Sequence, residues 1–302
     1  MVVVNALVPI FGLILLGYLL GKRHWLPSEA GGALAAITFR LFMPVLLFSG
    51  LARADLNEGL SPLLLLVYFV PALLVFSGVN WLMHRRLGQP SSMGLAASYS
   101  NNVLVGVPLI SILLGPDKLV YLFAILIFHS LVLFTLQSLY NAFWSGAGGG
   151  RIDKRALLKS LANPLIIGLL LGAALNLTGL TVPAPLWRMV EWLAAAALPC
   201  ALLVLGLSLS HYRLHISWET LGLTLVKLLV FPALVLAAGL LMPGLGADAR
   251  TVLVVMAACP TGVNVLAFVM GEADSRIISS VIFLSTVLAA VTLPVWLVLL
   301  NG

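Results

Sequence analysis

The sequence predicts an all-α polytopic membrane protein in which ten transmembrane helices form two inverted repeats of five. Three observations predict this fold class. Hydrophobic residues make up 62% of the 302 residues, and the mean hydropathy is +1.14. Only 9% of the residues are charged, a composition that a soluble domain of this length does not have. Motifs that contain proline recur in the same order in the two halves of the chain.

Ten apolar stretches follow one another along the chain. A helix of about 20 apolar residues crosses a hydrocarbon core of about 30 Å. The predicted spans 1 to 10 cover residues 2–20, 32–52, 62–83, 93–114, 118–143, 157–177, 187–209, 219–242, 250–270 and 276–300. Because the connections between them are short, we expect almost all of the chain to lie within the bilayer.

The basic residues between the spans predict the orientation of the chain. Loops after odd-numbered spans hold Lys22, Arg23, Arg85, Arg86, Arg151, Lys154, Arg155, Arg213 and Arg276, whereas loops after even-numbered spans hold Arg53, Lys118, Arg188 and Arg250. Loops rich in Lys and Arg stay in the cytoplasm, so we expect both termini outside in a multi-pass protein of the cell (inner) membrane. The net charge of +6 sits at helix ends and indicates no nucleic-acid partner.

No motif of an intramembrane enzyme is found in the sequence. It lacks HExxH, paired aspartates within the spans and Cys/His spacing of the zinc type. Cys200 and Cys259 both fall in predicted spans and give neither a disulfide framework nor metal-ligand spacing. We therefore expect no catalytic residue, no metal site and no cofactor.

The second half of the chain repeats the first. At an offset of 161 residues, "YFVPALLVFSG" (68–78) matches "LVFPALVLAAG" (229–239), and "AASYSNNV" (96–103) matches "AACPTGVN" (257–264). At an offset of 155, Pro9 matches Pro164, Gly17 matches Gly172, and Pro44 matches Pro199. Two consecutive groups of five spans must run in opposite orientations because five is odd. Such inverted repeats let a secondary transporter expose one site alternately to each side.

These matches also predict the domain organisation. Residues 1–143 form the first five-helix repeat and residues 157–302 form the second, inverted repeat. The linker at residues 144–156 contains the Gly-rich and basic stretch "GAGGGRIDKR" (146–155), and we expect it to be flexible and cytoplasmic.

Two polar stretches interrupt spans 4 and 9 at matching depths. They are "SYSNNVLVGVP" (98–108) and "CPTGVNVLAF" (259–268). Pro108 and Pro260 each remove a backbone donor and clash with the preceding turn, so we expect a helix break at each. The free amides near Leu109 and near Thr261 to Val263 would then form positive helix N-termini. Irregular backbone at membrane depth is tolerated where it lines a cavity or is buried in protein.

The paired break predicts a polar binding site that suits an anion. The candidate substrate-binding residues are Ser98, Asn101, Asn102, Thr261, Gly262, Asn264 and Lys227. An alternative for the amides and hydroxyls is that they only hold helices together by hydrogen bonds. The matching break in both repeats favours a transport site, because such sites concentrate at paired interruptions.

Three polar residues within spans have more than one interpretation. Lys227 in span 8 either attracts an anionic substrate, or replaces a coupling cation, or snorkels to the membrane surface. For Arg40 in span 2 we favour snorkelling. For His129 in span 5 we favour a buried side chain that hydrogen-bonds a neighbouring helix.

Several segments resemble the auxin efflux carrier family, which includes the plant PIN proteins and bacterial permeases. The resemblance covers nearly the whole chain, and its most specific parts are in spans 4 and 9. It rests on "FMPVLLFSGLA" (42–52), "SNNVLVGVPL" (100–109), "NPLIIGLLLG" (163–172), "LPCALLVLGLSL" (198–209), "KLLVFPALVLA" (227–237) and "PTGVNVLAF" (260–268).

The resemblance implies a ten-span fold of the bile-acid-symporter and NhaA type. Spans 1, 2, 6 and 7 would form a scaffold, and spans 3–5 and 8–10 a mobile transport domain that works as an elevator. Helices 4 and 9 would cross at the substrate site. The family moves organic anions such as auxins, malate or malonate, and its plant members are homodimers. We therefore expect a homodimer surrounded by lipid.

The resemblance also assigns roles to individual residues. Asn101 matches the substrate-contacting Asn of span 4, Pro108 matches its crossover proline, and Pro260 and Gly262 match the Pro-x-Gly of span 9. The plant pattern has a second proline at the position of Val265 and a Gln at that of Thr261. The chain also lacks the long plant cytoplasmic loop and the acidic and basic pair of span 3. A bacterial permease for a small carboxylate fits these departures better than a plant auxin carrier.

Together these observations predict a secondary transporter that moves a small organic anion, such as a mono- or dicarboxylate, by alternating access. Two alternatives are a sodium-coupled symporter of the bile-acid type and a channel-like anion facilitator. The first needs more carboxylates and amides around the crossover than this chain offers, and the inverted repeat with a single paired break argues against the second.

Overall fold

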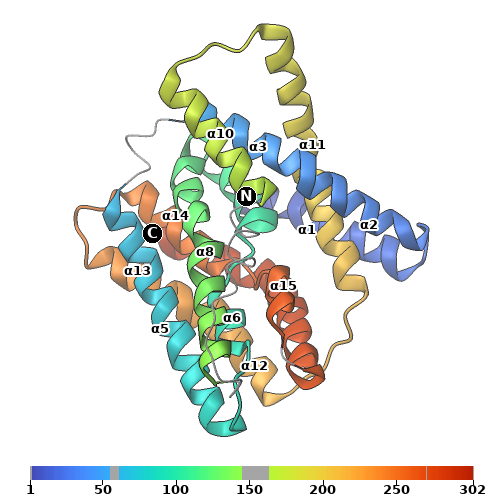
Figure 1. Cartoon of the computed structure of the whole chain (residues 1–302), viewed down its shortest axis with the longest axis vertical. Coiled ribbons are helices and arrows are strands. Elements are labelled where there is room, and N and C mark those ends of the chain that lie inside the picture. Colours follow the sequence, from blue (N-terminus) through green and yellow to red (C-terminus); the bar gives the residue numbers. More distant parts are fainter. Residues whose placement is uncertain (1, 55–60, 145–162, 270, 302) are drawn as a thin grey trace. The chain divides into compact units, whose positions relative to one another are not determined.

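The computed structural model describes residues 2–54, 61–144, 163–269 and 271–301. All secondary-structure elements in this part of the chain are helical, and Figure 1 follows them from α1 in blue to α15 in red. The α-helices are α1 (Val2–Lys22), α2 (Ser28–Ile37), α3 (Met43–Ala52), α5 (Pro62–Leu87), α6 (Met93–Ser98), α7 (Val107–Leu113), α8 (Leu119–Trp144), α10 (Pro164–Thr178), α11 (Ala184–Ser210), α12 (Trp218–Leu225), α13 (Phe231–Leu240), α14 (Ala247–Ala258) and α15 (Glu272–Asn301). Short π segments are η1 (Thr38–Phe42), η2 (Asn102–Gly106) and η4 (Val226–Val230), and 3-10 turns are η3 (Pro116–Lys118) and η5 (Val263–Phe268).

Six helical stretches of the described residues are long and apolar enough to cross a membrane. They are Glu29–Ala52, Pro62–Leu87, Pro116–Trp144, Ala184–Ser210, Trp218–Leu240 and Glu272–Leu300. The predicted spans 1, 4 and 6 correspond to shorter apolar helices, Leu7–Lys22, Asn102–Leu113 and Pro164–Thr178. Span 9 corresponds to α14 followed by η5. The all-helical, multi-pass class is therefore confirmed, whereas the number of ten crossings and the full inverted repeat stay predictions.

The three π segments share one sequence feature. Each ends two residues before a proline, namely Pro44, Pro108 or Pro232. A proline donates no backbone hydrogen bond and pushes away the carbonyl four residues earlier, and a wider turn accommodates both effects. At Pro232 this freed carbonyl belongs to Leu228, and it accepts a hydrogen bond from the indole N–H of Trp296 at 2.8 Å.

The prediction that Pro108 breaks span 4 is wrong. The chain remains helical from η2 into α7, and Gly106 at this junction has helical dihedral angles of φ −64° and ψ −47°. It leaves the helical path earlier, where α6 ends at Ser98 and Tyr99 is extended. Pro108 lies just after η2, whose wider turn accommodates the missing amide hydrogen, so the proline does not end the helix.

The chain divides into two compact units. Unit 1 comprises Met1–Leu60, Val103–Ile127 and Lys159–His211, and unit 2 comprises Ser61–Asn102, Phe128–Leu158 and Tyr212–Gly302. Each unit takes segments from both predicted repeats. The assignment of repeats, scaffold and transport domain stays a prediction. The predicted linker at 144–156 lies, apart from Trp144, outside the described residues.

Unit 1 is built on close contacts between helix backbones. Gly17 of α1 lies against the backbone of Leu203 in α11, and a Cβ atom at Gly17 would collide with the Leu203 carbonyl. Gly172 of α10 lies in the same way against Phe48 of α3, whose carbonyl oxygen would be 2.5 Å from the added Cβ. Small residues permit such approaches between membrane helices, where packing has to replace the hydrophobic effect.

These two contacts are images of each other under the predicted repeat. Gly17 corresponds to Gly172 at an offset of 155 residues, and Phe48 corresponds to Leu203 at the same offset. The glycine of each predicted repeat therefore packs on the equivalent residue of the other repeat. This reciprocity is what a two-fold relation within unit 1 requires.

Gly17→Ala tests this packing. We expect the added methyl group to push α1 and α11 apart and to destabilise the protein by about 1–3 kcal/mol, as overpacking does. Gly12→Ala on the same helix is the matched control, because nothing lies within 4 Å of its added Cβ. Thermal unfolding of the purified variants in detergent measures both effects. Equal melting temperatures for the two variants would contradict the close contact.

Candidate functional site

Two interrupted helices meet in unit 2. After α6 and α14 end, the chain is extended, and Ser100 and Thr261 form an isolated antiparallel β-bridge. The backbone N–H of Asn101 donates to the carbonyl of Pro260 at 2.8 Å, and the N–H of Gly262 donates to the carbonyl of Tyr99 at 3.0 Å. We call these two extended segments, residues 99–101 and 259–262, the paired break.

The paired break has its own two-fold relation. At the offset of 161 residues, Tyr99 corresponds to Pro260, Ser100 to Thr261, and Asn101 to Gly262. Each of the two backbone hydrogen bonds is therefore the image of the other, and the bridge joins two equivalent residues. Together with the reciprocal contacts of unit 1, this supports the repeat predicted from the prolines.

Two of the backbone amides that were expected to be free at the break already have partners. The N–H of Thr261 donates to Oγ of Ser285 at 3.1 Å, and the N–H of Gly262 is taken by Tyr99. No new helix begins near Leu109, because η2 continues into α7. The prediction of free amides is therefore wrong at Thr261 and Gly262, and so is that of a new helix near Leu109. A short helical segment, η5, does begin at Val263, and anion binding at its N-terminus stays a prediction. The two extended segments instead satisfy each other.

Lys227 reaches the paired break from η4. Its side chain is fully buried, which excludes the snorkelling interpretation. The ammonium group donates to Oγ of Ser100 at 2.7 Å and to the carbonyl of Ala257 at 2.6 Å, and it lies 4.9 Å from the ring centroid of Phe231. Lys227, the cationic residue of predicted span 8, thus directs its ammonium group at the paired break.

The position of this ammonium group breaks the local symmetry. In the other half of the break, Oγ1 of Thr261 donates directly to the carbonyl of Ala96 at 2.8 Å. The images of these two residues are Ser100 and Ala257, and between them lies Nζ of Lys227. The residue that corresponds to Lys227 in the first predicted repeat is Leu66, which carries no charge.

The charge of Lys227 is not neutralised by an acidic residue in the described part of the chain. No ion pair of Lys227 is found there, and pairs such as Arg53–Glu191, Lys118–Asp117 and Arg276–Glu272 lie elsewhere. Burying an ammonium group costs several kcal/mol even after relaxation, and neutral hydrogen-bond acceptors offset this only in part. The paired break therefore holds a buried ammonium group without an acidic counter-charge among the described residues.

A second polar group lies in the core of unit 2. The hydroxyl of Tyr68 is 3.2 Å from Nε2 of His129 and accepts from Nδ2 of Asn102 at 3.3 Å. All three side chains are buried, and Oδ1 of Asn102 has no partner among the described residues. His129 therefore makes the interhelical hydrogen bond that we favoured.

Sequence reasoning missed Tyr68. The available signal is a tyrosine within an apolar span, three residues before Pro71. A buried tyrosine needs a partner for its hydroxyl, so its neighbours in space had to be polar. Which neighbours these are depends on contacts between distant helices, and the sequence does not reveal them.

The remaining candidates are spread over different surroundings. Oγ of Ser98 donates to the carbonyl of Gly94 in its own helix at 2.9 Å, so this hydroxyl stabilises α6. Asn101 is buried at the break, whereas Asn264 in η5 is exposed. Pro108 belongs to unit 1, and the side chain of Arg40 in η1 is exposed. The structure thus assembles Asn101, Pro260, Thr261, Gly262 and Lys227 around one bridge, with Asn102 next in sequence.

Comparison with known proteins identifies the family. A family model described as "Membrane transport protein" matches residues 2–147 and 150–297. The chain is similar to an "Uncharacterized transporter" of Methanothermobacter thermautotrophicus, with 30% identity over 303 residues and 95% of each chain covered. It is also similar to a "Putative malonate transporter" of Rhizobium meliloti, with 29% identity over 281 residues that cover 89% of this chain and 86% of the relative. The chain therefore belongs to this membrane transport protein family, that of the auxin efflux carriers.

Proposed function

We propose that the protein is a secondary transporter that moves a small organic anion, such as malonate or another mono- or dicarboxylate, across the cell membrane by alternating access. The observation that carries this proposal is the buried ammonium group of Lys227 at the paired break, with no acidic partner in the described part of the chain. The name of the relative in Rhizobium meliloti supports a short dicarboxylate. The predicted homodimer and outside location of both termini are part of the same proposal.

The hydrogen bonds of Lys227 leave it able to bind a carboxylate. An ammonium group has three protons to donate, and Ser100 and Ala257 accept two of them. A carboxylate that reaches the break takes the third and neutralises the charge. Charge-assisted hydrogen bonds of this kind are roughly twice as strong as neutral ones, and their strength grows in surroundings that exclude water.

The position of Lys227 also suggests whether a coupling ion is needed. Its ammonium group lies between a hydroxyl oxygen and a carbonyl oxygen, which are ligands that a sodium ion takes at broken helices. An ammonium group in this position takes the place of such an ion. We therefore propose that anion binding at the paired break does not require sodium.

Lys227→Met separates a role in transport from a role in stability. Methionine is unbranched and nearly as long as lysine, and it removes the charge. Ser100 is then able to donate to Ala257 as Thr261 donates to Ala96. We expect an unchanged or higher melting temperature, because an uncompensated buried charge is lost. We also expect the apparent KM for malonate uptake into proteoliposomes to rise about tenfold or more, which corresponds to about 1.4 kcal/mol.

Lys227→Arg serves as the matched control. It keeps the charge, and we expect it to recover uptake only in part, because a planar guanidinium group is not a point charge. An unchanged KM for Lys227→Met, at matched protein levels, would remove Lys227 from the binding site and with it the basis of the proposal.

Malonate should stabilise the purified protein through this charge. A ligand at a hundred times its dissociation constant stabilises the folded state by about 2.7 kcal/mol, and we expect a corresponding rise in melting temperature. Malonamide has a similar shape without charge, and we expect it to give no shift. Replacing sodium by choline should leave the malonate shift unchanged. A shift for malonamide as large as for malonate would show that charge is not recognised.

Asn101→Ala and Asn264→Ala test the amides. Both variants should insert normally, because each change makes an apolar stretch more apolar. We expect Asn101→Ala to lower malonate uptake strongly, since its buried side chain lies at the bridge. The effect of Asn264→Ala should be smaller, since its side chain is exposed. Normal uptake by both variants would leave the amides a purely structural role.

A further inference from the structure

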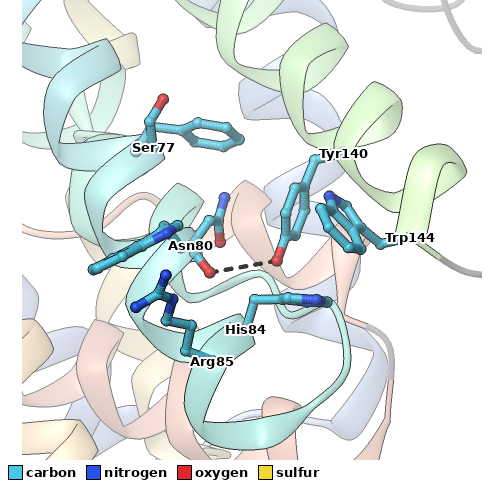
Figure 2. Close-up of a pocket in the computed structure, with 8 residues that line it drawn as sticks. Ser77, Asn80, His84, Arg85, Tyr140 and Trp144 are labelled. Carbon is cyan, nitrogen blue, oxygen red and sulfur yellow. Dashed lines mark hydrogen bonds between the residues drawn. The ribbon is translucent and has the colours of Figure 1, made fainter.

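A cavity with aromatic and polar lining residues lies in unit 2, between the C-terminal halves of α5 and α8 (Figure 2). Its volume is about 350 Å³, and it is lined by Phe76, Ser77, Asn80, Trp81, His84, Arg85, Tyr140 and Trp144. The hydroxyl of Tyr140 donates to the backbone carbonyl of Asn80 at 3.5 Å and ties the two helices together on one side. None of the lining residues belongs to the paired break.

The cavity offers hydrogen-bond donors that have no partner in the described part of the chain. Asn80 is only 2% exposed, and its Oδ1 accepts the backbone N–H of Gly94 at 3.1 Å. This bond fixes the orientation of the amide, so the other end is the donor Nδ2, which is buried and has no described partner. Nδ1 of His84 is buried without a described partner as well. Such groups lose free energy unless a ligand or water satisfies them.

The charge of the cavity is positive. Arg85 lines it, with its guanidinium group 4.2 Å from the ring centroid of Trp81. The lining residues include no Asp or Glu. Amide and guanidinium donors without an acidic side chain suit an anion, whereas a cation such as a quaternary ammonium ion would be repelled by Arg85.

The location of the cavity indicates where such an anion comes from. It lies at the end of the candidate span Pro62–Leu87, whose last turn carries His84, Arg85 and Arg86. Trp81 and Trp144 lie near the ends of their spans, and tryptophan is enriched where the bilayer meets water. Basic pockets between membrane helices at this level bind the headgroups of anionic lipids.

We propose that this cavity binds a phosphate group, with Nδ2 of Asn80 and the ring of His84 as hydrogen-bond donors and Arg85 as the counter-charge. The ring of His84 is held for this role by Trp144, whose ring centroid is 4.2 Å away. The phosphate comes either from the headgroup of an anionic phospholipid or from free phosphate. The chemistry of the site is the same in both cases, and it is independent of anion transport at the paired break.

Titration of the purified full chain with phosphatidylglycerol and phosphatidylcholine, read by native mass spectrometry, tests the proposal. We expect phosphatidylglycerol to bind more tightly than phosphatidylcholine, because choline brings a cation towards Arg85. Asn80→Asp keeps the acceptor for Gly94 and replaces the donor by a negatively charged oxygen. We expect this variant to weaken phosphatidylglycerol binding about tenfold or more, which corresponds to about 1.4 kcal/mol.

Arg85→Gln and Arg86→Gln form a matched pair of exposed neighbours on the same helix, of which only Arg85 lines the cavity. We expect Arg85→Gln to weaken phosphatidylglycerol binding and Arg86→Gln to leave it nearly unchanged. Equal losses in these two variants would overturn the proposal in favour of general surface charge. Equal binding of the two lipids by the wild type, together with no effect of inorganic phosphate on its melting temperature, would overturn it as well. Because both arginines are exposed, this comparison stands even if Asn80→Asp fails to fold.

A parallel titration with inorganic phosphate distinguishes the two sources. If phosphate shifts the melting temperature of the wild type and not of Arg85→Gln, free phosphate occupies the site. If only phosphatidylglycerol shows this dependence, the site is specific for lipid. The stabilisation by malonate should be the same in wild type, Arg85→Gln and Arg86→Gln. A negative result for the phosphate site therefore leaves the transport proposal unaffected, and a negative result for malonate leaves the phosphate site unaffected.

Discussion

Every backbone hydrogen bond that a helix gives up inside a membrane must be replaced by the chain itself, because lipid offers no donor or acceptor. The structure of unit 2 follows from this constraint. Where α6 and α14 end, the two extended segments exchange hydrogen bonds between Asn101 and Pro260 and between Gly262 and Tyr99. Where Pro232 frees a carbonyl, the indole of Trp296 reaches Leu228. The polar residues of these apolar helices are thus first of all partners for the backbone.

The same constraint explains why the position of Lys227 is informative. The symmetric half of the break is complete without a charge, since the Thr261 hydroxyl donates directly to Ala96. A hydroxyl at Ser100 is able to do the same for Ala257, so backbone satisfaction does not require the lysine. The backbone does not need this ammonium group, and its burial costs free energy, which is why we propose that it binds a ligand of opposite charge.

Polar groups in unit 2 therefore fall into two kinds. Some complete the fold, such as Ser98, Ser285 and the pair Tyr68–His129, since their hydrogen bonds end on other groups of the protein. Others have a donor or a charge that the protein does not fully satisfy, such as Lys227 at the break and Asn80 in the cavity between α5 and α8. Lys227 and Asn80 lie at different places along the candidate spans. We propose that they bind anions that differ in kind, a transported carboxylate and a phosphate group.

The sequence by itself determined the helical class, the approximate extent of the apolar helices and the pairing of two polar stretches, because hydropathy and proline act on the chain locally. It placed the break of span 9 at Pro260 correctly, where α14 gives way to an extended segment. It did not place the break of span 4, which lies at Tyr99 to Asn101 and not at Pro108. Only the tertiary structure decided that break, the burial of Lys227 and the contact of Tyr68 with His129. The physical reason is that each of these features depends on a partner far along the chain. Ser100 and Lys227, for example, are 127 residues apart, and no local pattern specifies which distant group will be near.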